Sequence, residues 1–282
     1  MGSLVAALAS YLDARSNNGS WLLRIDDIDP PREAPGATDS IIASLAQHGL
    51  CWDNDIIFQS HNTHRYAAAL QHLRGLADGT AVFACVCSRA AMGPGGICCG
   101  TCREQPPAGD RPHALRIAVP ASQLIRCEDA LQGPQCWELG HTAADFVLRR
   151  KDGLWAYQLA AAVDDTENGI TDVVRGSDLL DSTPKQLFLQ ALLGKTAPRY
   201  CHLPVIVNSN GQKLSKQNHA APLDNTNAVR NLRVALRFLG QMPPPASLTE
   251  VDALLHFATQ AWQLARVPAQ LARPAAEVGW PG

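Results

Sequence analysis

The stretch Gly211-Gln212-Lys213-Leu214-Ser215-Lys216-Gln217-Asn218 places a lysine on each side of a Leu-Ser pair. It follows the apolar segment 205–207, which predicts a strand, and the Asn-Ser-Asn-Gly run at 208–211 predicts the turn between them. Lysines on a polar loop can hold a polyphosphate, and they can stabilise the negative charge that develops when a phosphoryl group is attacked. A solvated surface loop is the structural alternative, because four-residue matches are common by chance.

A second polar group follows another expected strand. Residues 21–25 form a short and almost continuously apolar run, which is typical of a buried strand, and Asp26-Asp27-Ile28-Asp29 comes directly after it. Ligands bind at the carboxyl ends of strands in open α/β sheets, so these carboxylates are candidates for holding an amine or a metal ion. A polar turn ahead of Pro30-Pro31 is the alternative.

A third polar group follows the apolar segment 170–174, which also predicts a strand. Arg175-Gly176-Ser177-Asp178 comes next, and the planar guanidinium of Arg175 suits a carboxylate ligand. An ion pair between Arg175 and Asp178 is the structural alternative. Further on, Thr183-Pro184-Lys185-Gln186 predicts a capping box with proline at the first helical position.

The spacing of apolar residues predicts the rest of the framework. Helices are expected near residues 4–12, 41–45, 66–73, 158–163, 187–192, 229–239 and 251–264, and strands at 114–119 and in a hairpin with arms 146–148 and 154–157. An α/β unit normally begins with a strand, so a helix directly ahead of the run 21–25 indicates that an opening strand and its loop are missing. On the 229–239 helix, Arg230, Arg233 and Arg237 share a face, which indicates either a solvated surface or a stripe that contacts RNA.

The region from residue 83 to about 111 is rich in Gly, Pro and Cys and has no helical period. It contains Cys85-x-Cys87 and Cys98-Cys99-x-x-Cys102. Thiolates are soft ligands, and two close pairs across a loop suit a tetrahedral zinc ion. Four thiolates leave no open position, so such a metal would hold the loop rather than take part in chemistry. Free buried thiols are the alternative, and Cys99 competes with Cys98 as a ligand.

Composition narrows the class of protein. With 282 residues, of which 46% are hydrophobic and 18% charged, the chain suits a globular protein with one large or two smaller domains. The net charge of −2 excludes a global basic field, so RNA binding would need a local patch. No apolar run reaches the ~18 residues of a membrane span, and the first residues lack the basic region of a signal peptide. Five of the nine cysteines lie between 85 and 102, which favours a metal site in a reducing compartment.

Taken in order, these motifs resemble the catalytic domain of class I glutamyl-tRNA synthetases over nearly the whole chain. The resemblance rests on RIDDIDPPRE at 24–33, DGLWAY at 152–157, DD at 164–165, RGSD at 175–178, TPKQ at 183–186 and KLSK at 213–216. Several spaced motifs in the right order are far more specific than any one of them. Within the family, the chain is most similar to the branch without an anticodon-binding domain. Three features carry this likeness: Pro-Pro-Arg-Glu, the cysteine-bearing insert, and Lys-Gln-Asn after the Leu-Ser pair.

The resemblance implies an α/β, Rossmann-like class I aminoacyl-tRNA synthetase catalytic domain with a zinc-bearing insert and a helical C-terminal region. The expected segments are the first part of the catalytic domain at 1–82, the zinc-bearing insert at 83–127, the second part with the KLSKQ loop at 128–222, and the helical C-terminal region at 223–282. For this branch it implies an ATP-dependent ligase that activates glutamate without tRNA and esterifies it to queuosine, the modified wobble base of tRNA(Asp). The alternatives are a fragment that charges the tRNA 3′ end and a non-catalytic nucleotide- or RNA-binding module.

The resemblance also assigns roles to single residues. The glutamate-binding positions are matched by Asp26, which receives the amino group, and by Tyr157 and Arg175. The ATP-binding positions are matched by Lys213, Ser215 and Lys216, of which Lys216 is the catalytic residue that touches the phosphates. The ligands of a structural Zn²⁺ are matched by Cys85, Cys87, Cys98 and Cys102. We further expect Mg²⁺ to bind together with ATP. We also expect a monomeric protein that is located in the cytoplasm and makes no contact with a membrane.

The chain departs from the family's pattern at several positions. Asp26 stands where the family usually has glutamate, so its shorter arm must reach further or bind through water. Cys98 stands where tyrosine is often found, which changes the ligand set without removing the site. Lys-Leu-Ser-Lys-Gln replaces the usual Lys-Met-Ser-Lys-Ser. Gly2-Ser3-Leu4 matches only the residues after the family's His-Ile-Gly-His-type signature, so we expect this chain by itself to activate glutamate poorly or not at all.

Overall fold

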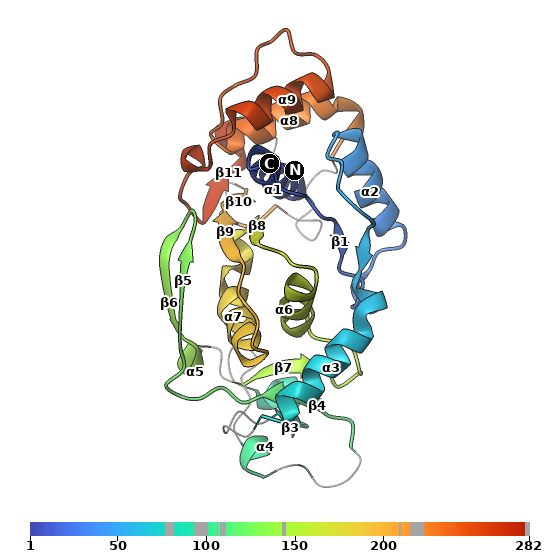
Figure 1. Ribbon diagram of the computed structural model, residues 1–282, viewed down its shortest axis with the longest axis vertical. Coiled ribbons are helices and arrows are strands. Elements are labelled where there is room, and N and C mark those ends of the chain that lie inside the picture. The colour runs from blue at the N-terminus through green and yellow to red at the C-terminus, as the bar shows by residue number, and fades with distance from the viewer. Residues whose placement is uncertain are drawn as a thin grey trace.

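The computed structural model describes residues 1–76, 82–92, 101–105, 107, 111–142, 145–208, 210–214 and 223–279. The molecule is elongated, with a group of helices at one end, an antiparallel sheet at the other, and a mixed sheet with further helices between them (Figure 1). Among the described residues, no helix combines the length and the apolar character that crossing a bilayer requires.

The helical end is formed by α1 (Gly2–Ser16), α8 (Ala228–Phe238) and α9 (Val251–Ala261). Leu8 and Leu12 of α1 are completely buried, and they share one core with Leu236 and Leu254 from the other two helices. These helices were predicted from their spacing alone, because each buries one apolar stripe. The C-terminal region is not wholly helical, since β11 (Ala272–Pro274) pairs in parallel with β10 (Val205–Val207).

The parallel strands form separate sheets rather than one. Strand β1 (Arg24–Ile25) pairs with β2 (Ile57–Phe58), whereas β8 (Asp172–Gly176) pairs with β9 (Arg199–Leu203). The sheet that contains β8 continues through β5 (Leu124–Asp129) to β6 (Gly133–Glu138), in the order β6-β5-β9-β8. Strand β1 is shorter than the predicted strand, and in the described residues no pairing joins β1 to β8.

At the opposite end, β3 (Val82–Cys85), β4 (Ala114–Ile117) and β7 (Phe146–Arg149) form an antiparallel sheet, and α4 (Thr101–Glu104) packs beside β3. The predicted hairpin after β7 is reduced to one bridge, between Arg149 and Trp155. The predicted boundary at 127 falls inside β5, which pairs with both β6 and β9.

Further from the helical end lie α3 (Thr63–Arg74), α6 (Tyr157–Glu167) and α7 (Thr183–Leu192), and the short α5 (Leu139–Thr142) lies at the foot of β5 and β6 (Figure 1). Helix α2 (Ala37–Gln47) lies beside the helical end, where its Leu45 joins that core. Tyr66, Leu159 and Phe188 come from three helices and belong to one buried cluster. The capping box predicted for α7 is wrong. Ser182 precedes the helix without a side-chain cap, and the Thr183 hydroxyl contacts Arg175 instead.

Candidate active site

A cluster of opposite charges lies where β1 ends. Arg24 donates through Nε to Asp26 Oδ1 at 2.7 Å and through its Nη1 to Asp165 Oδ1 at 2.6 Å. Asp26 directly follows β1 and is two residues from Arg24, so this contact is local in the sequence. Asp26 is 41% exposed and remains accessible to a ligand, whereas Asp165 is buried. Burial raises the pKa of Asp165 above its usual value, although Arg24 and Arg175 oppose that effect.

Helix α6 presents Asp164 and Asp165 to different surroundings. Asp164 is completely buried and accepts hydrogen bonds from Gln59 Nε2 at 2.9 Å, Asn62 Nδ2 at 3.1 Å and the Tyr66 hydroxyl at 2.6 Å. Burial and the bond to this carboxylate raise the pKa of Tyr66. Asp164 therefore ties α6 to α3, while Asp165 faces the charged cluster.

Arg175 lies inside the sheet rather than on an open loop. Its Nε donates to His202 Nε2 at 3.1 Å, and its two terminal nitrogens donate to Gln186 Oε1 and Thr183 Oγ1, each at 2.8 Å. The guanidinium also lies 5.0 Å from the ring centre of Tyr200. The sequence left open an ion pair between Arg175 and Asp178. Among the residues that the structure describes, Asp178 pairs with Lys213 instead.

Two residues behind Arg175 were not singled out from the sequence. His202 is completely buried, and its Nδ1 lies 2.6 Å from Asp129 Oδ2. Burial alone would raise the pKa of Asp129, but hydrogen bonds from His202 and from the backbone amides of Gln132 and Leu131 outweigh it and hold that pKa below its usual value. The register between β8 and β9 sets Arg175 opposite His202 and so creates the contact between these two side chains.

The first lysine of the KLSK loop lies at the ends of β8 and β10. The predicted turn is confirmed: Asn208 Oδ1 accepts from the amides of Asn210 and Gln212, and Gly211 adopts a φ of +75°. Lys213 bridges back to Val207 and its Nζ lies 2.6 Å from Asp178 Oδ2. Ser215 and Lys216 lie outside the described residues.

Tyr157 is the first residue of α6 and is half-buried. Helical rise places it about 12 Å along the axis from Asp165. The side chain that Asp26 and Asp165 share is Arg24, which bonds to both carboxylates. The charge of Arg175 also acts on Asp165, where it lowers the pKa.

Three of the predicted zinc ligands meet beside β3. The sulfur atoms of Cys85, Cys87 and Cys102 all lie within 4.8 Å of one another, and the distance from Cys87 to Cys102 is 3.6 Å. Thiolates on a tetrahedral zinc ion, with Zn–S bonds near 2.3 Å, stand about 3.8 Å apart. The three thiols could therefore hold a metal ion. Cys98 and Cys99 lie outside the described residues.

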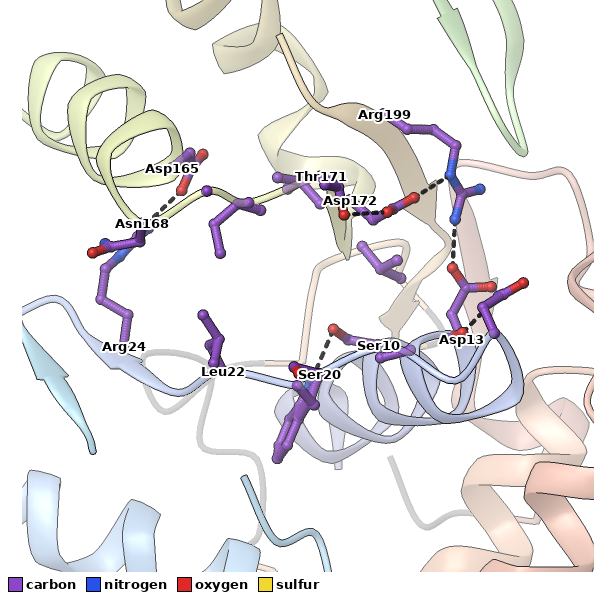
Figure 2. A pocket seen from close by; sticks show the side chains of 18 of the residues that line it. Ser10, Asp13, Ser20, Leu22, Arg24, Asp165, Asn168, Thr171, Asp172 and Arg199 are labelled. Atoms are coloured by element: carbon purple, nitrogen blue, oxygen red, sulfur yellow. Dashed lines mark hydrogen bonds and ion pairs between the residues drawn. The ribbon is translucent and has the colours of Figure 1, made fainter. Parts of the chain in front are cut away.

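A cavity of about 1130 Å³ separates the facing edges of β1 and β8. Leu22 and Arg24 line one side, Thr171 and Asp172 line the other, and α1 closes the base (Figure 2). Arg24 reaches Asp165 at one end, and Arg199 lies between Asp13 and Asp172 at the other (Figure 2). Among the predicted site residues, Asp26, Tyr157, Arg175 and Lys213 are not part of this lining. The cavity therefore shares only Arg24 and Asp165 with the charged cluster.

Comparisons with known proteins agree with this arrangement. The family model for tRNA synthetases class I (E and Q), catalytic domain, matches residues 1–93 and 102–239, so the fold and site define a class I synthetase catalytic domain. A glutamyl-Q tRNA(Asp) synthetase from Chromobacterium violaceum is 46% identical over 275 residues, which cover 95% of this chain and 91% of the relative. One from Pseudomonas entomophila is 47% identical over 281 residues, covering 98% and 93%. The chain therefore belongs to the family of glutamyl-Q tRNA(Asp) synthetases.

A solved structure supports the fold assignment. The glutamate tRNA ligase from Elizabethkingia meningosepticum, in complex with its amino acid, superposes with a TM-score of 0.78. The match covers 98% of this chain and 64% of that one, at 22% sequence identity, so the likeness concerns the fold alone.

Proposed function

We propose that this protein activates glutamate with ATP, without needing tRNA for that step, and transfers the glutamate to the queuosine base at the wobble position of tRNA(Asp). Membership of the glutamyl-Q tRNA(Asp) synthetase family supports the reaction. The observation that supports the proposal is an accessible carboxylate, Asp26, beside the Arg24–Asp165 ion pair, together with the buried guanidinium of Arg175, whose charge also acts on Asp165. A dicarboxylic amino acid needs both an anion for its amine and a cation for its carboxylate.

Arg175 is suited to choose glutamate over an uncharged amino acid. Its guanidinium is buried, and it donates hydrogen bonds to an imidazole nitrogen, an amide oxygen, a hydroxyl and a backbone carbonyl rather than to a carboxylate. A buried cation that lacks a direct anionic partner is costly, and a carboxylate ligand would offset that cost. An amide in the same place would leave the charge uncompensated, which gives selection against glutamine. Asp26 would receive the amino group, with Tyr157 completing the pocket.

In the activation step, an oxygen of the glutamate α-carboxylate attacks the α-phosphorus of ATP. A P–O bond forms, the bond to the β-phosphate breaks, and pyrophosphate leaves with that electron pair. Both reactants are anionic, so the protein contributes mainly positioning and charge neutralisation. Lys216 would touch the phosphates as the catalytic residue, with Lys213 and Ser215 supporting it.

In the transfer step, one hydroxyl of the cyclopentenediol of queuosine attacks the carbonyl of the activated glutamate. An ester bond forms, AMP leaves, and the hydroxyl proton passes to solvent or to AMP. Mg²⁺ bound to the ATP phosphates would neutralise part of their charge during activation. A structural Zn²⁺ would be held by Cys85, Cys87 and Cys102, together with Cys98, away from the reacting atoms.

Glutamate-dependent exchange of pyrophosphate into ATP, measured without tRNA, tests the activation step. The assay is run with glutamate and, as the control, with glutamine. We expect exchange with glutamate in the absence of tRNA and almost none with glutamine. Exchange that appears only after tRNA is added would contradict the proposal and favour a glutamyl-tRNA synthetase that charges the 3′ end.

Periodate separates the two possible acceptors. It cleaves a free 1,2-diol, and an ester protects only the diol that it occupies. We expect the queuosine diol of the product tRNA to survive while the 3′-terminal ribose is oxidised. Survival of the 3′ diol instead would reject transfer to queuosine.

A further inference from the structure

A second pocket, of about 320 Å³, opens beside the turn that follows β7. Its lining is cationic, with Arg111, Arg149, Arg150 and Lys151 around it and His113 among them. The pocket exists because β4 and β7 are antiparallel neighbours. Antiparallel pairing brings the residues that enter β4 next to those that leave β7. Two basic segments that lie far apart in the sequence therefore meet at one edge of the sheet.

The charges in this pocket are not balanced. Arg150 is neutralised by Asp29 and Asp152, at 2.8 and 2.6 Å. Among the residues that the structure describes, no carboxylate forms an ion pair with Arg111, Arg149 or Lys151, all of which are exposed. In a chain whose net charge is −2, such a local excess of positive charge marks a site for an anion.

Arg149 is already held in place for a ligand. Its Nε donates to the Gly153 carbonyl at 3.0 Å, and its guanidinium lies 5.0 Å from the centre of the Trp155 ring. The terminal nitrogens of a fixed arginine can form the paired hydrogen bonds that a phosphate accepts. Because Arg149 is ordered before binding, less side-chain entropy is lost when the anion arrives.

We propose that this pocket binds phosphate groups of the RNA backbone of the tRNA substrate, an inference that rests on the proposed function. The link is the ion pair between Arg150 and Asp29, since Asp29 is three residues beyond Asp26 on the same loop. Three residues span at most about 10 Å, so a backbone held in the pocket would pass close to the glutamate cluster. Backbone contacts of this kind position an RNA without reading its sequence.

The stripe on α8 is the less suitable RNA contact. Arg233 donates to the carbonyl oxygens of Pro244, Pro245 and Leu248, at 2.7, 2.8 and 2.7 Å. These bonds anchor the loop between α8 and α9, so Arg233 has a structural role. Arg230 of the same helix is exposed, and it serves below as part of the control.

The test measures binding of tRNA(Asp), with and without queuosine, by fluorescence anisotropy between 50 and 200 mM salt. The variant carries Arg111→Glu and Lys151→Glu, and the control carries Arg126→Glu and Arg230→Glu, which changes the net charge equally at two other exposed sites. We expect the pocket variant to bind at least about tenfold more weakly and to have a salt slope less negative by about 2, because about one counterion is released for each phosphate contact. Both forms of the tRNA should lose affinity equally.

Three outcomes would overturn the inference. The first is an equal loss of tRNA affinity in the control variant, which would mean a general effect of net charge. The second is a salt slope that is the same in the pocket variant as in the parent. The third is weaker binding of an ATP analogue with RNA binding intact, which would assign the pocket to the phosphates of ATP. Unfolding midpoints within about 2 °C of the parent would show that the exposed substitutions leave the fold intact. Because binding is measured without catalysis, failure of glutamate transfer to queuosine would reject the proposed function and leave this result standing.

Discussion

Arg175 donates a hydrogen bond from Nε to His202 Nε2 at 3.1 Å, and this contact fixes which nitrogen of His202 carries the proton. A nitrogen that accepts a hydrogen bond from a guanidinium is unprotonated, so the proton lies on Nδ1 and is donated to Asp129 at 2.6 Å. The three residues come from β8, β9 and β5, which are adjacent in the sheet. The carboxylate of Asp129 therefore orients Arg175 through His202.

Replacing Asp129 with asparagine should weaken both the fold and glutamate binding. An amide facing His202 favours the other tautomer, in which Nε2 carries a proton and can no longer accept from Arg175. We expect the Asp129→Asn variant to lose about 2 kcal/mol of unfolding free energy, as for a buried hydrogen bond to a charged group. We also expect its KM for glutamate to rise more than its kcat falls, in pyrophosphate exchange.

The matched control is Asp172→Asn on the neighbouring strand. Asp172 pairs with Arg199 at the surface, where its side chain is 44% exposed. An exposed ion pair contributes about 1 kcal/mol or less, so this variant should keep its KM for glutamate. If both variants shifted KM alike, Asp129 would have no special role in orienting Arg175.

The same carboxylate should give the stability of the protein a defined dependence on pH. The pKa of Asp129 lies below its unfolded value of about 3.9, so its contribution is fully present above that value and is lost as the pH falls through the folded pKa. The difference in unfolding free energy between parent and Asp129→Asn should thus stay constant from pH 7 to about 5 and shrink below about 4. Urea unfolding at each pH measures it, and a difference that grows on acidification would contradict the assignment.

Local patterns in the sequence were sufficient for the helices and the turns. The apolar stripe of α8 and the turn at Asn208 depend on residues within a few positions, so their spacing alone specifies them. The contact between Arg24 and Asp26 is likewise local, because the two residues are only two positions apart in the sequence. The acidic strand end is accordingly a candidate site that the sequence alone predicts.

Contacts that depend on the register of strands distant in the sequence could not be predicted. Asp129 and His202 lie 73 residues apart, and neither stands in a motif. Thr183 was interpreted as a helix cap because its local pattern fits one, but a buried arginine competes for its hydroxyl. The separation of the parallel strands is likewise a tertiary property, since the run 21–25 gives no sign of which strand it pairs with.

Metal binding provides a test of the cysteine cluster. In the parent protein we expect about one bound zinc ion per chain by elemental analysis, and almost none in Cys102→Ser, because Cys102 is buried among the other two thiols. A chelator should lower the unfolding midpoint of the parent and leave that of the variant unchanged. Cys136→Ser, which removes an exposed thiol on β6, should retain the metal. Equal zinc contents in parent and Cys102→Ser would remove Cys102 from the ligand set.

Lys213 should matter for ATP more than for folding. Its ion pair with Asp178 joins side chains that are 49% and 35% exposed, so Lys213→Met should change the unfolding free energy by less than about 1 kcal/mol. If its ammonium group contacts a phosphate of ATP, losing that charged hydrogen bond should raise the KM for ATP about tenfold. Pyrophosphate exchange at varied ATP and saturating glutamate measures this change.

Lys195→Met is the matched control for the lysine. Lys195 pairs with Glu167 at 2.9 Å, with side chains 45% and 40% exposed, so the two variants remove ion pairs of similar strength. Lys195 lies just after α7 rather than in the KLSK loop, and its loss should leave the KM for ATP unchanged. A normal KM in Lys213→Met would mean that Asp178 holds this lysine only to shape the loop, and that contact with the phosphates falls to Lys216.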